Sequence, residues 1–235
     1  VIAAPARFHA SQFMAAIGPG VLMLIEKPLS LSGYEAGLML VADCGKTRVG
    51  YNLRYHYGLL VLKESLLDGF EVTHASFTVR CDKSKWPGKS YEDMLLEGSH
   101  EIDLALWLLG PATCVGAAGS GDSWTLMLKH HSGATSIVTL DGTYRSHLRE
   151  WSIGGPSGIR TCSWSDAAHG WRVCYSGFAF DADPMPVPAD VLYEYELQDF
   201  LSGYSTGEPS GGCTIEEAAA VIKVCDEARR LTRER

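Results

Sequence analysis

The first part of the chain alternates between short strand-like runs and segments whose apolar residues recur at helical spacing. Strands are predicted at Val1–Ala4, Val21–Ile25 and Arg48–Asn52, and helices follow at His9–Ile17, Ser32–Asp43 and Tyr57–Asp68. The apolar cores of these strands lack polar alternation, which is typical of strands covered on both faces by helices. The pattern therefore predicts parallel β–α–β units.

Beyond Gly69 the pattern changes to half-exposed strands. Val72–Cys81 alternates between polar and apolar residues, and a strong helix is predicted from His100 to Leu109. Further strands follow at Val115–Gly119, Thr125–His130, Thr135–Leu140, Glu150–Ile153, Gly158–Trp164 and Trp171–Tyr175. Turn signals separate them, so this region is interpreted as an antiparallel meander. Helices at Leu192–Leu201 and Thr214–Arg233 close the chain, the second with Thr214 and Glu217 spaced as a capping box.

Composition and charge narrow the class of partner. The 235 residues carry a formal net charge of -8 and show no cluster of basic residues, so we expect no nucleic-acid partner. The longest apolar runs, such as Val21–Ile25, are too short to span a bilayer. The seven cysteines form no close CxxC pair, which favours reduced thiols in a cytoplasmic protein over a disulfide framework or a zinc site.

Four short motifs follow one another along the chain. A strand ends in Ala4-Pro5 with His9 four residues on, and the next strand ends in Glu26-Lys27-Pro28. The strand sequence GYNLRYH then covers residues 50–56, and EGSHEID opens a helix at residues 97–103. Together these motifs resemble the glucose–fructose oxidoreductase / inositol dehydrogenase / MocA family. Within it, the chain is most similar to members that modify sugars or nucleotide sugars.

The resemblance implies a fold and a division of the chain. We expect an α/β protein: a partial doubly wound parallel (Rossmann) sheet, then an α+β domain with an open, mostly antiparallel sheet. Residues 1–56 would form the C-terminal half of the dinucleotide-binding domain. Residues 57–235 would form the substrate and oligomerisation domain, with helix 214–233 packing back on the first part. Such a sheet often forms the oligomer interface in this family, so we expect a homodimer or homotetramer.

The phosphate-binding part of a dinucleotide domain is not recognisable near the start of the chain. No GxGxxG follows the first strand, and the glycines of residues 116–121 lie inside the meander rather than before a helix. At about 30 residues per β–α–β unit, on the order of 60 to 90 residues would be needed to complete such a domain. We expect the natural polypeptide to extend N-terminally and to carry that loop.

Lys27 and His100 are the candidate catalytic residues. Lys27 ends a parallel strand, where ligands of such sheets gather, and it could bind a substrate hydroxyl or lower the pKa of a nearby base. His100 begins a helix, whose positive dipole end disfavours the imidazolium and leaves the ring able to accept a proton. The alternatives are a surface lysine before a turn proline and a histidine bonded to backbone.

Four further residues are candidates for substrate binding: Glu97, Asp103, Arg54 and Trp86. Many family members carry an aspartate four residues before the catalytic histidine, where this chain has Leu96; Glu97 could reach the same hydroxyl or be an ordinary solvated side chain. Asp103, one turn after His100, could orient that ring or pair elsewhere. Arg54 could equally form a surface ion pair. Trp86 could stack on a sugar or the cofactor, but packing is slightly favoured.

The resemblance also assigns residues to the cofactor, which would be NAD or NADP. These are Ala4, Pro5, His9, Glu26, Lys27, Pro28 and Asn52. No metal site is expected, since His130 and His131 are adjacent on a strand and point to opposite faces.

We therefore expect an NAD(P)-dependent oxidoreductase acting on a hydroxyl of a sugar or sugar nucleotide. One alternative is redox-neutral use of bound NAD in epimerisation or glycoside elimination. Another is a non-catalytic scaffold without a cofactor, which the unrecognised phosphate loop favours and the joint presence of Lys27 and His100 opposes.

Overall fold

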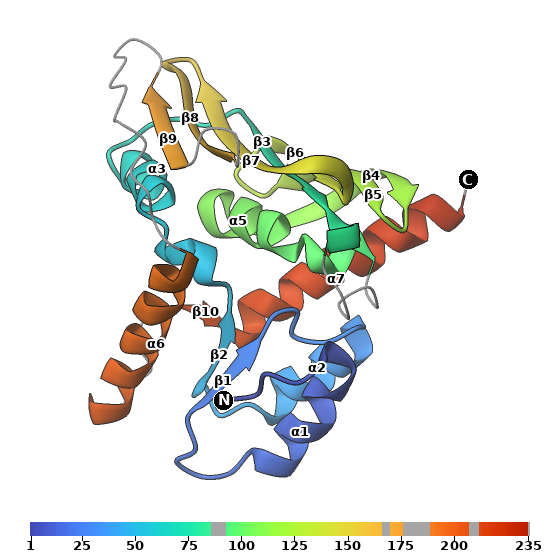
Figure 1. Cartoon of the computed structure of the whole chain (residues 1–235), viewed down its shortest axis with the longest axis vertical. Helices are drawn as coiled ribbons and strands as arrows, with labels where there is room; N and C mark the ends of the chain where they lie inside the picture. Colours follow the sequence, from blue (N-terminus) through green and yellow to red (C-terminus); the bar gives the residue numbers. More distant parts are fainter. Residues whose placement is uncertain (86–92, 166–169, 176–188, 207–211, 235) are drawn as a thin grey trace.

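The computed structural model describes residues 1–85, 93–165, 170–175, 189–206 and 212–234. Within them the strands form a small three-stranded sheet and a larger seven-stranded one. Figure 1 shows the large sheet at one end of the molecule and the small sheet with its helices at the other. The predicted fold class is confirmed: a parallel α/β unit is followed by a mostly antiparallel open sheet.

The small sheet is built from the first predicted strands. β1 (Met23–Glu26) and β2 (Thr47–Gly50) pair in parallel, and Ile2 adds a parallel bridge to Ile25 on the other edge of β1. Helices α1 (His9–Ala16) and α2 (Gly33–Ala42) connect these strands, after a short 3-10 turn, η1 (Ala6–Phe8). β10 (Cys213–Thr214) joins antiparallel to β2 and was not predicted, because two residues carry no recognisable period.

The large sheet has the order β4-β5-β6-β3-β7-β8-β9. The strands are β3 (His74–Asp82), β4 (Ala112–Ser120), β5 (Ser123–His130), β6 (Thr135–Asp141), β7 (Thr143–Gly155), β8 (Gly158–Ser165) and β9 (Gly170–Tyr175). The predicted simple meander is wrong at one point. β3 lies between β6 and β7 and runs parallel to β6. Alternation identifies a strand and its buried face, but it does not identify the neighbouring strand.

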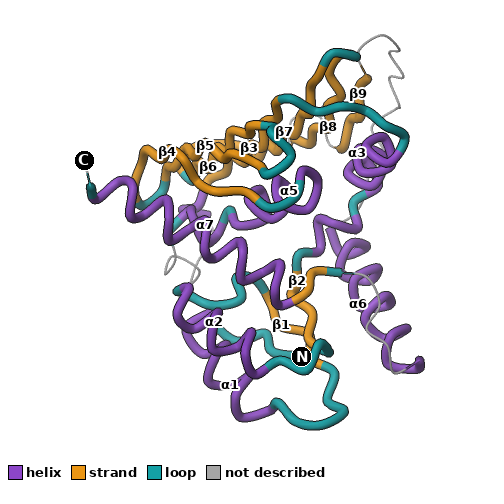
Figure 2. The backbone as a smooth tube through the Cα atoms, turned by 180° about the vertical axis from the view of Figure 1, so that it is seen from behind, coloured by secondary structure: helices purple, strands orange, loops and turns teal. Residues whose placement is uncertain are grey.

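Helices cover one face of this sheet. In Figures 1 and 2, α5 (Ser99–Leu109) and α7 (Ile215–Arg233) lie on the side that faces the small sheet. The remaining helical elements are η2 (Asn52–Tyr55), α3 (Tyr57–Leu67), η3 (Lys83–Lys85), α4 (Met94–Glu97) and α6 (Ala189–Thr206). The capping box predicted for α7 is present, with Thr214 and Glu217 each bonding the other's backbone. No helix among the described residues is long and apolar enough to cross a membrane.

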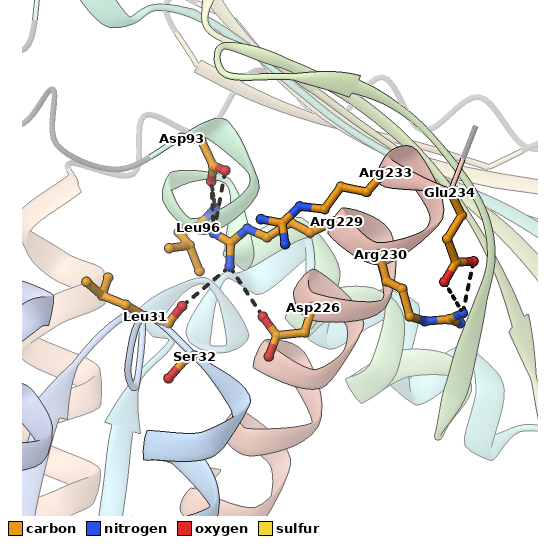
Figure 3. A pocket seen from close by; sticks show the side chains of 9 residues that line it. All are labelled: Leu31, Ser32, Asp93, Leu96, Asp226, Arg229, Arg230, Arg233 and Glu234. Carbon is orange, nitrogen blue, oxygen red and sulfur yellow. Dashed lines mark hydrogen bonds and ion pairs between the residues drawn. The ribbon is translucent and has the colours of Figure 1, made fainter.

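Helix α7 contacts the starts of α2 and α4 through polar groups in its C-terminal half. Asp226 accepts a hydrogen bond of 2.7 Å from the Gly33 amide at the start of α2. Arg229 donates to the Leu31 carbonyl and to Asp93 at the start of α4, each at 3.4 Å. Figure 3 shows Leu31, Asp93, Asp226 and Arg229 around a pocket of about 850 Å³, which the ion pair of Arg230 and Glu234 also lines. Neither Lys27 nor His100 lines this pocket.

The opposite face of the large sheet carries no helix among the described residues (Figure 2). Val115, Met127 and Ile137 lie on the adjacent strands β4, β5 and β6 and are 48%, 43% and 38% exposed. Met127 and Ile137 are direct partners in the strand register. An uncovered sheet face with clustered apolar side chains is typical of a protein–protein interface.

We expect this face to form the interface of a dimer or tetramer. Light scattering at micromolar concentration should give a mass at least twice that of the monomer. Ile137→Glu should shift the population toward monomer, because a charge buried at such an interface is costly. Tyr34→Lys, on the exposed side of α2, is the matched control and should leave the mass unchanged. A monomeric parent protein would contradict the prediction.

Candidate active site

Lys27 lies directly after β1, at the carboxyl edge of the parallel sheet. Its Nζ donates to the Glu97 carbonyl oxygen at 3.0 Å and lies 3.4 Å from Oε2 of the same residue. Glu97 ends α4, so the contact joins the small sheet to the helices beneath the large sheet. The expected alternative of a freely solvated Glu97 does not describe this structure, since the carboxylate is paired with Lys27.

The junction between α4 and α5 brings Glu97 and His100 to the same place. Asp93 caps α4 by accepting from the Leu96 amide, and Gly98 separates the two helices. A Cβ at Gly98 would lie 2.8 Å from Leu140 and 2.9 Å from the Met94 carbonyl oxygen. Only glycine therefore fits this close approach between the junction and β6.

His100 occupies the first turn of α5 and is largely buried. The Tyr51 ring meets it edge-on, with 5.5 Å between ring centroids. Its Nδ1 atom is buried and has no hydrogen-bond partner among the residues that the structure describes. The alternative was a helix-start histidine hydrogen-bonded to the backbone. Among the described residues, no backbone group bonds Nδ1.

Burial and neighbouring charges set the ionisation of this site. Burial, followed by the positive charges of Lys27 and Arg149, holds the pKa of His100 well below its usual value. Burial also lowers the pKa of Lys27, although the adjacent Glu97 carboxylate opposes that effect. A neutral imidazole beside a lysine can accept a proton from a neutral hydroxyl, which is the arrangement that general base catalysis requires.

A second ion pair adjoins the site and was missed from the sequence. Glu101, the residue after His100, is fully buried and pairs with Arg149 of β7. Arg149 lies in register with Val79 of β3, on the same face as Trp151 two residues on. The predicted strand began at Glu150, one residue after Arg149. Arg149 falls in the buried phase only because β7 extends back to Thr143.

Arg54 and Asp103 bind each other. Arg54 Nε donates to Asp103 Oδ2 at 2.9 Å and Nη2 donates to Oδ1 at 2.7 Å, with the side chains 5% and 1% exposed. Arg54 Nη1 also contacts Glu217 of α7 at 3.0 Å. The alternative considered for Arg54, an ion pair on the surface, is therefore wrong: Arg54 does form an ion pair, but the pair is buried. Both oxygens of Asp103 are engaged by Arg54, so the structure contains no orienting bond from Asp103 to His100.

The residues expected near the cofactor gather around the ends of β1 and β2. Asn52 lies in η2 rather than at the end of a strand, because β2 ends at Gly50. His9 is buried, with its two ring nitrogens 2.7 Å from the Ala4 carbonyl oxygen and 2.9 Å from that of Pro28. His9 thus connects the turn that begins at Ala4-Pro5 to the residue after Lys27. Trp86 lies outside the described residues.

Helix α6 adds a carboxyl group that the sequence analysis did not single out. Glu196 is largely buried, and burial together with the neighbouring Glu26 raises its pKa to about 8. Glu26 immediately precedes Lys27, so α6 approaches the same edge of the small sheet. Helix α6 is only weakly amphipathic, so its sequence does not show which face is buried and did not predict that Glu196 lies near Glu26.

The described residues thus combine a parallel α/β unit, an open antiparallel-rich sheet and a lysine–glutamate–histidine cluster between them. This is the class expected of the nicotinamide-dependent sugar oxidoreductases that the sequence motifs resemble. Comparison with known proteins confirms the resemblance to the glucose–fructose oxidoreductase / inositol dehydrogenase / MocA family. No family model matches the chain.

Three of the similar proteins illustrate this resemblance. The chain is 25% identical over 264 residues to inositol 2-dehydrogenase of Cereibacter sphaeroides, covering 94% of this chain and 72% of that protein. Levoglucosan dehydrogenase in complex with NADH and levoglucosan superposes with a TM-score of 0.80 at 19% identity, covering 99% and 77% of the two chains. UDP-N-acetylglucosamine 3-dehydrogenase of Acidithiobacillus ferrooxidans gives 0.78 at 20% identity, covering 98% and 76%. These structures establish the shared fold.

Proposed function

We propose that the protein is an NAD(P)-dependent oxidoreductase that acts on a hydroxyl group of a sugar or sugar nucleotide. The observation that carries the proposal is the cluster of Lys27, Glu97 and neutral His100 at the carboxyl edge of β1. Three named relatives support it, since they are dehydrogenases of inositol, levoglucosan and UDP-N-acetylglucosamine.

The residues at this edge fit a nicotinamide cofactor. Ligands of open parallel sheets bind outside the carboxyl ends of the strands, where Lys27, Pro28 and Asn52 lie. These residues would hold the nicotinamide end, and the bound cofactor would supply a hydride acceptor. His9 would contribute through the Ala4 and Pro28 carbonyls that it contacts.

Each polar side chain of the cluster has a chemical role in this proposal. His100 takes the hydroxyl proton as general base. Lys27 donates a hydrogen bond to the substrate oxygen and stabilises the negative charge that develops there. Glu97 holds Lys27 through its carbonyl and carboxylate. Many family members carry an aspartate at the preceding position, which is Leu96 in this chain.

An assay of the full-length protein tests the proposal. The protein is incubated with NAD or NADP and with panels of polyols, sugars and UDP-sugars, and reduced cofactor is followed by absorbance. Substrate-dependent formation of reduced cofactor in proportion to product supports an oxidoreductase. Product formed without net reduced cofactor would support the redox-neutral alternative, and absence of cofactor binding in calorimetry would support the scaffold.

Replacement of Lys27 by methionine should change the pH dependence of the reaction. The Lys27 charge opposes protonation of His100, so its removal should raise the pKa of His100. Activity requires the neutral ring, so the acid limb of the kcat/KM profile should move to higher pH. The value of kcat should also fall, and its loss should be less than additive with that of His100→Ala.

The matched control is Lys63→Met, because Lys63 is a second lysine whose pKa burial lowers. Lys63 donates to the Trp107 carbonyl oxygen, a contact that does not involve the cluster. Its replacement should leave the acid limb where it is. An unchanged limb in Lys27→Met would remove Lys27 from the electrostatics of the base.

A further inference from the structure

The ion pair between Glu101 and Arg149 adjoins the proposed base. Glu101 follows His100 directly in the first turn of α5 and is 0% exposed, while Arg149 projects from β7 and is 14% exposed. Arg149 Nη1 contacts Glu101 Oε1, and the other carboxylate oxygen is buried without a hydrogen-bond partner among the described residues. The pair therefore connects the first turn of α5 to the large sheet.

Buried apolar residues neighbour both members of the pair along their own elements. Arg149 lies opposite Val79 of β3, and Trp151 and Ile153 occupy the next positions on the same face of β7. Ile102 and Leu104 follow Glu101 on α5 and are fully buried. An apolar pair at these two positions would avoid the desolvation of two charges, so a contribution to stability does not account for the ion pair.

The position of the Arg149 charge suggests another role. Its guanidinium lowers the pKa of both His100 and Lys27, as a like charge within interaction range does. Two cation–carboxylate pairs thus flank the histidine: Lys27 with Glu97, and Arg149 with Glu101. The first pair comes from the small sheet and α4, and the second comes from α5 and the large sheet.

We propose that Arg149, held by Glu101, is a positioning residue for His100 that fixes the first turn of α5 against β7 and keeps a positive charge beside the imidazole. The inference rests on the proposed function of His100 as general base. Arg149 acts through His100 and not on the substrate. Glu101 prevents the guanidinium from turning away, and its buried carboxylate gives the arginine one fixed orientation.

The test uses a double variant, Glu101→Gln with Arg149→Met, in the full-length protein. Arg149→Met alone would leave a buried carboxylate without its partner and could fail to fold. The double variant buries no charge and keeps a polar group of similar size on α5. Arg149→Lys retains the charge, and Arg80→Met is the matched control on the opposite face of the same sheet, where Arg80 lies over Tyr144.

The first measurement is the protonation of His100, followed by nitrogen chemical shifts of the imidazole as the pH is lowered. It needs no substrate or turnover, so it stands apart from the proposed function. The midpoint should be higher in the double variant than in Glu101→Gln alone, by up to about one unit, because these two proteins differ only in the like charge of Arg149. Lys27→Met should raise it further, because Lys27 affects His100 more strongly than Arg149 does. Arg149→Lys and Arg80→Met should stay close to the parent.

The second measurement is the kcat/KM profile of each variant. The acid limb should move to higher pH in the double variant, and kcat should fall while KM changes little. A folded double variant with the His100 midpoint and the acid limb of Glu101→Gln would overturn the proposal. If the midpoint moves but no variant affects turnover, then the proposed role of His100 fails while the coupling of Arg149 to that ring stands.

Discussion

Replacement of His100 by alanine is expected to lower kcat by about 10²–10⁴-fold, the range typical of general base catalysis. The affinity for the nicotinamide cofactor should stay nearly unchanged, because the variant removes the proton acceptor and leaves the edge of β1 intact. Steady-state kinetics with the substrate found in the panel assay give kcat, and calorimetry gives the cofactor affinity. The buried, neutral imidazole beside Lys27 is the physical basis of this expectation.

Two comparisons make this result specific. His131→Ala, an exposed histidine in the turn after β5, should keep the parent activity. Activity within a few-fold of the parent in His100→Ala would remove this histidine from the mechanism. The base would then be Lys27 itself or Glu97, which are the other titratable groups of the cluster.

Much of the fold was predictable because short-range patterns determine it. The starts of α2, α5 and α7 were each predicted to within one residue from apolar spacing, from a capping serine or threonine, or from the motif around His100. The parallel pairing of β1 and β2 followed from strand–helix alternation with short connections. By contrast, the insertion of β3 beside β6 is a long-range pairing that alternation does not encode.

The candidate site was predictable in part for the same reason. Lys27 and His100 were singled out by motifs that lie about seventy residues apart in the chain, and Lys27 contacts Glu97 in that second motif. Arg149 was missed because its partner, Glu101, lies on another element. The predicted strand also began one residue after Arg149, so its place in the buried phase of β7 was not recognised.

The buried pair of Arg54 and Asp103 leads to the largest expected effect on stability. Arg54→Met should lower the free energy of unfolding by about 3–5 kcal/mol, because it leaves the Asp103 carboxylate buried without its partner. The two hydrogen bonds of 2.9 and 2.7 Å that satisfy both carboxylate oxygens would be lost together. Urea denaturation followed by circular dichroism measures the change.

A double variant separates the cost of an unpaired charge from the value of the pair itself. Arg54→Met with Asp103→Leu buries no charge at either position, so most of the lost stability should return. Arg230→Met is the matched control, since Arg230 forms an exposed pair with Glu234 at 3.1 Å. Exposed pairs contribute about 0–1 kcal/mol, so this control should stay close to the parent. If the double variant were as unstable as Arg54→Met alone, the destabilisation would come from loss of the Arg54 guanidinium over the Trp107 ring and not from the uncompensated carboxylate.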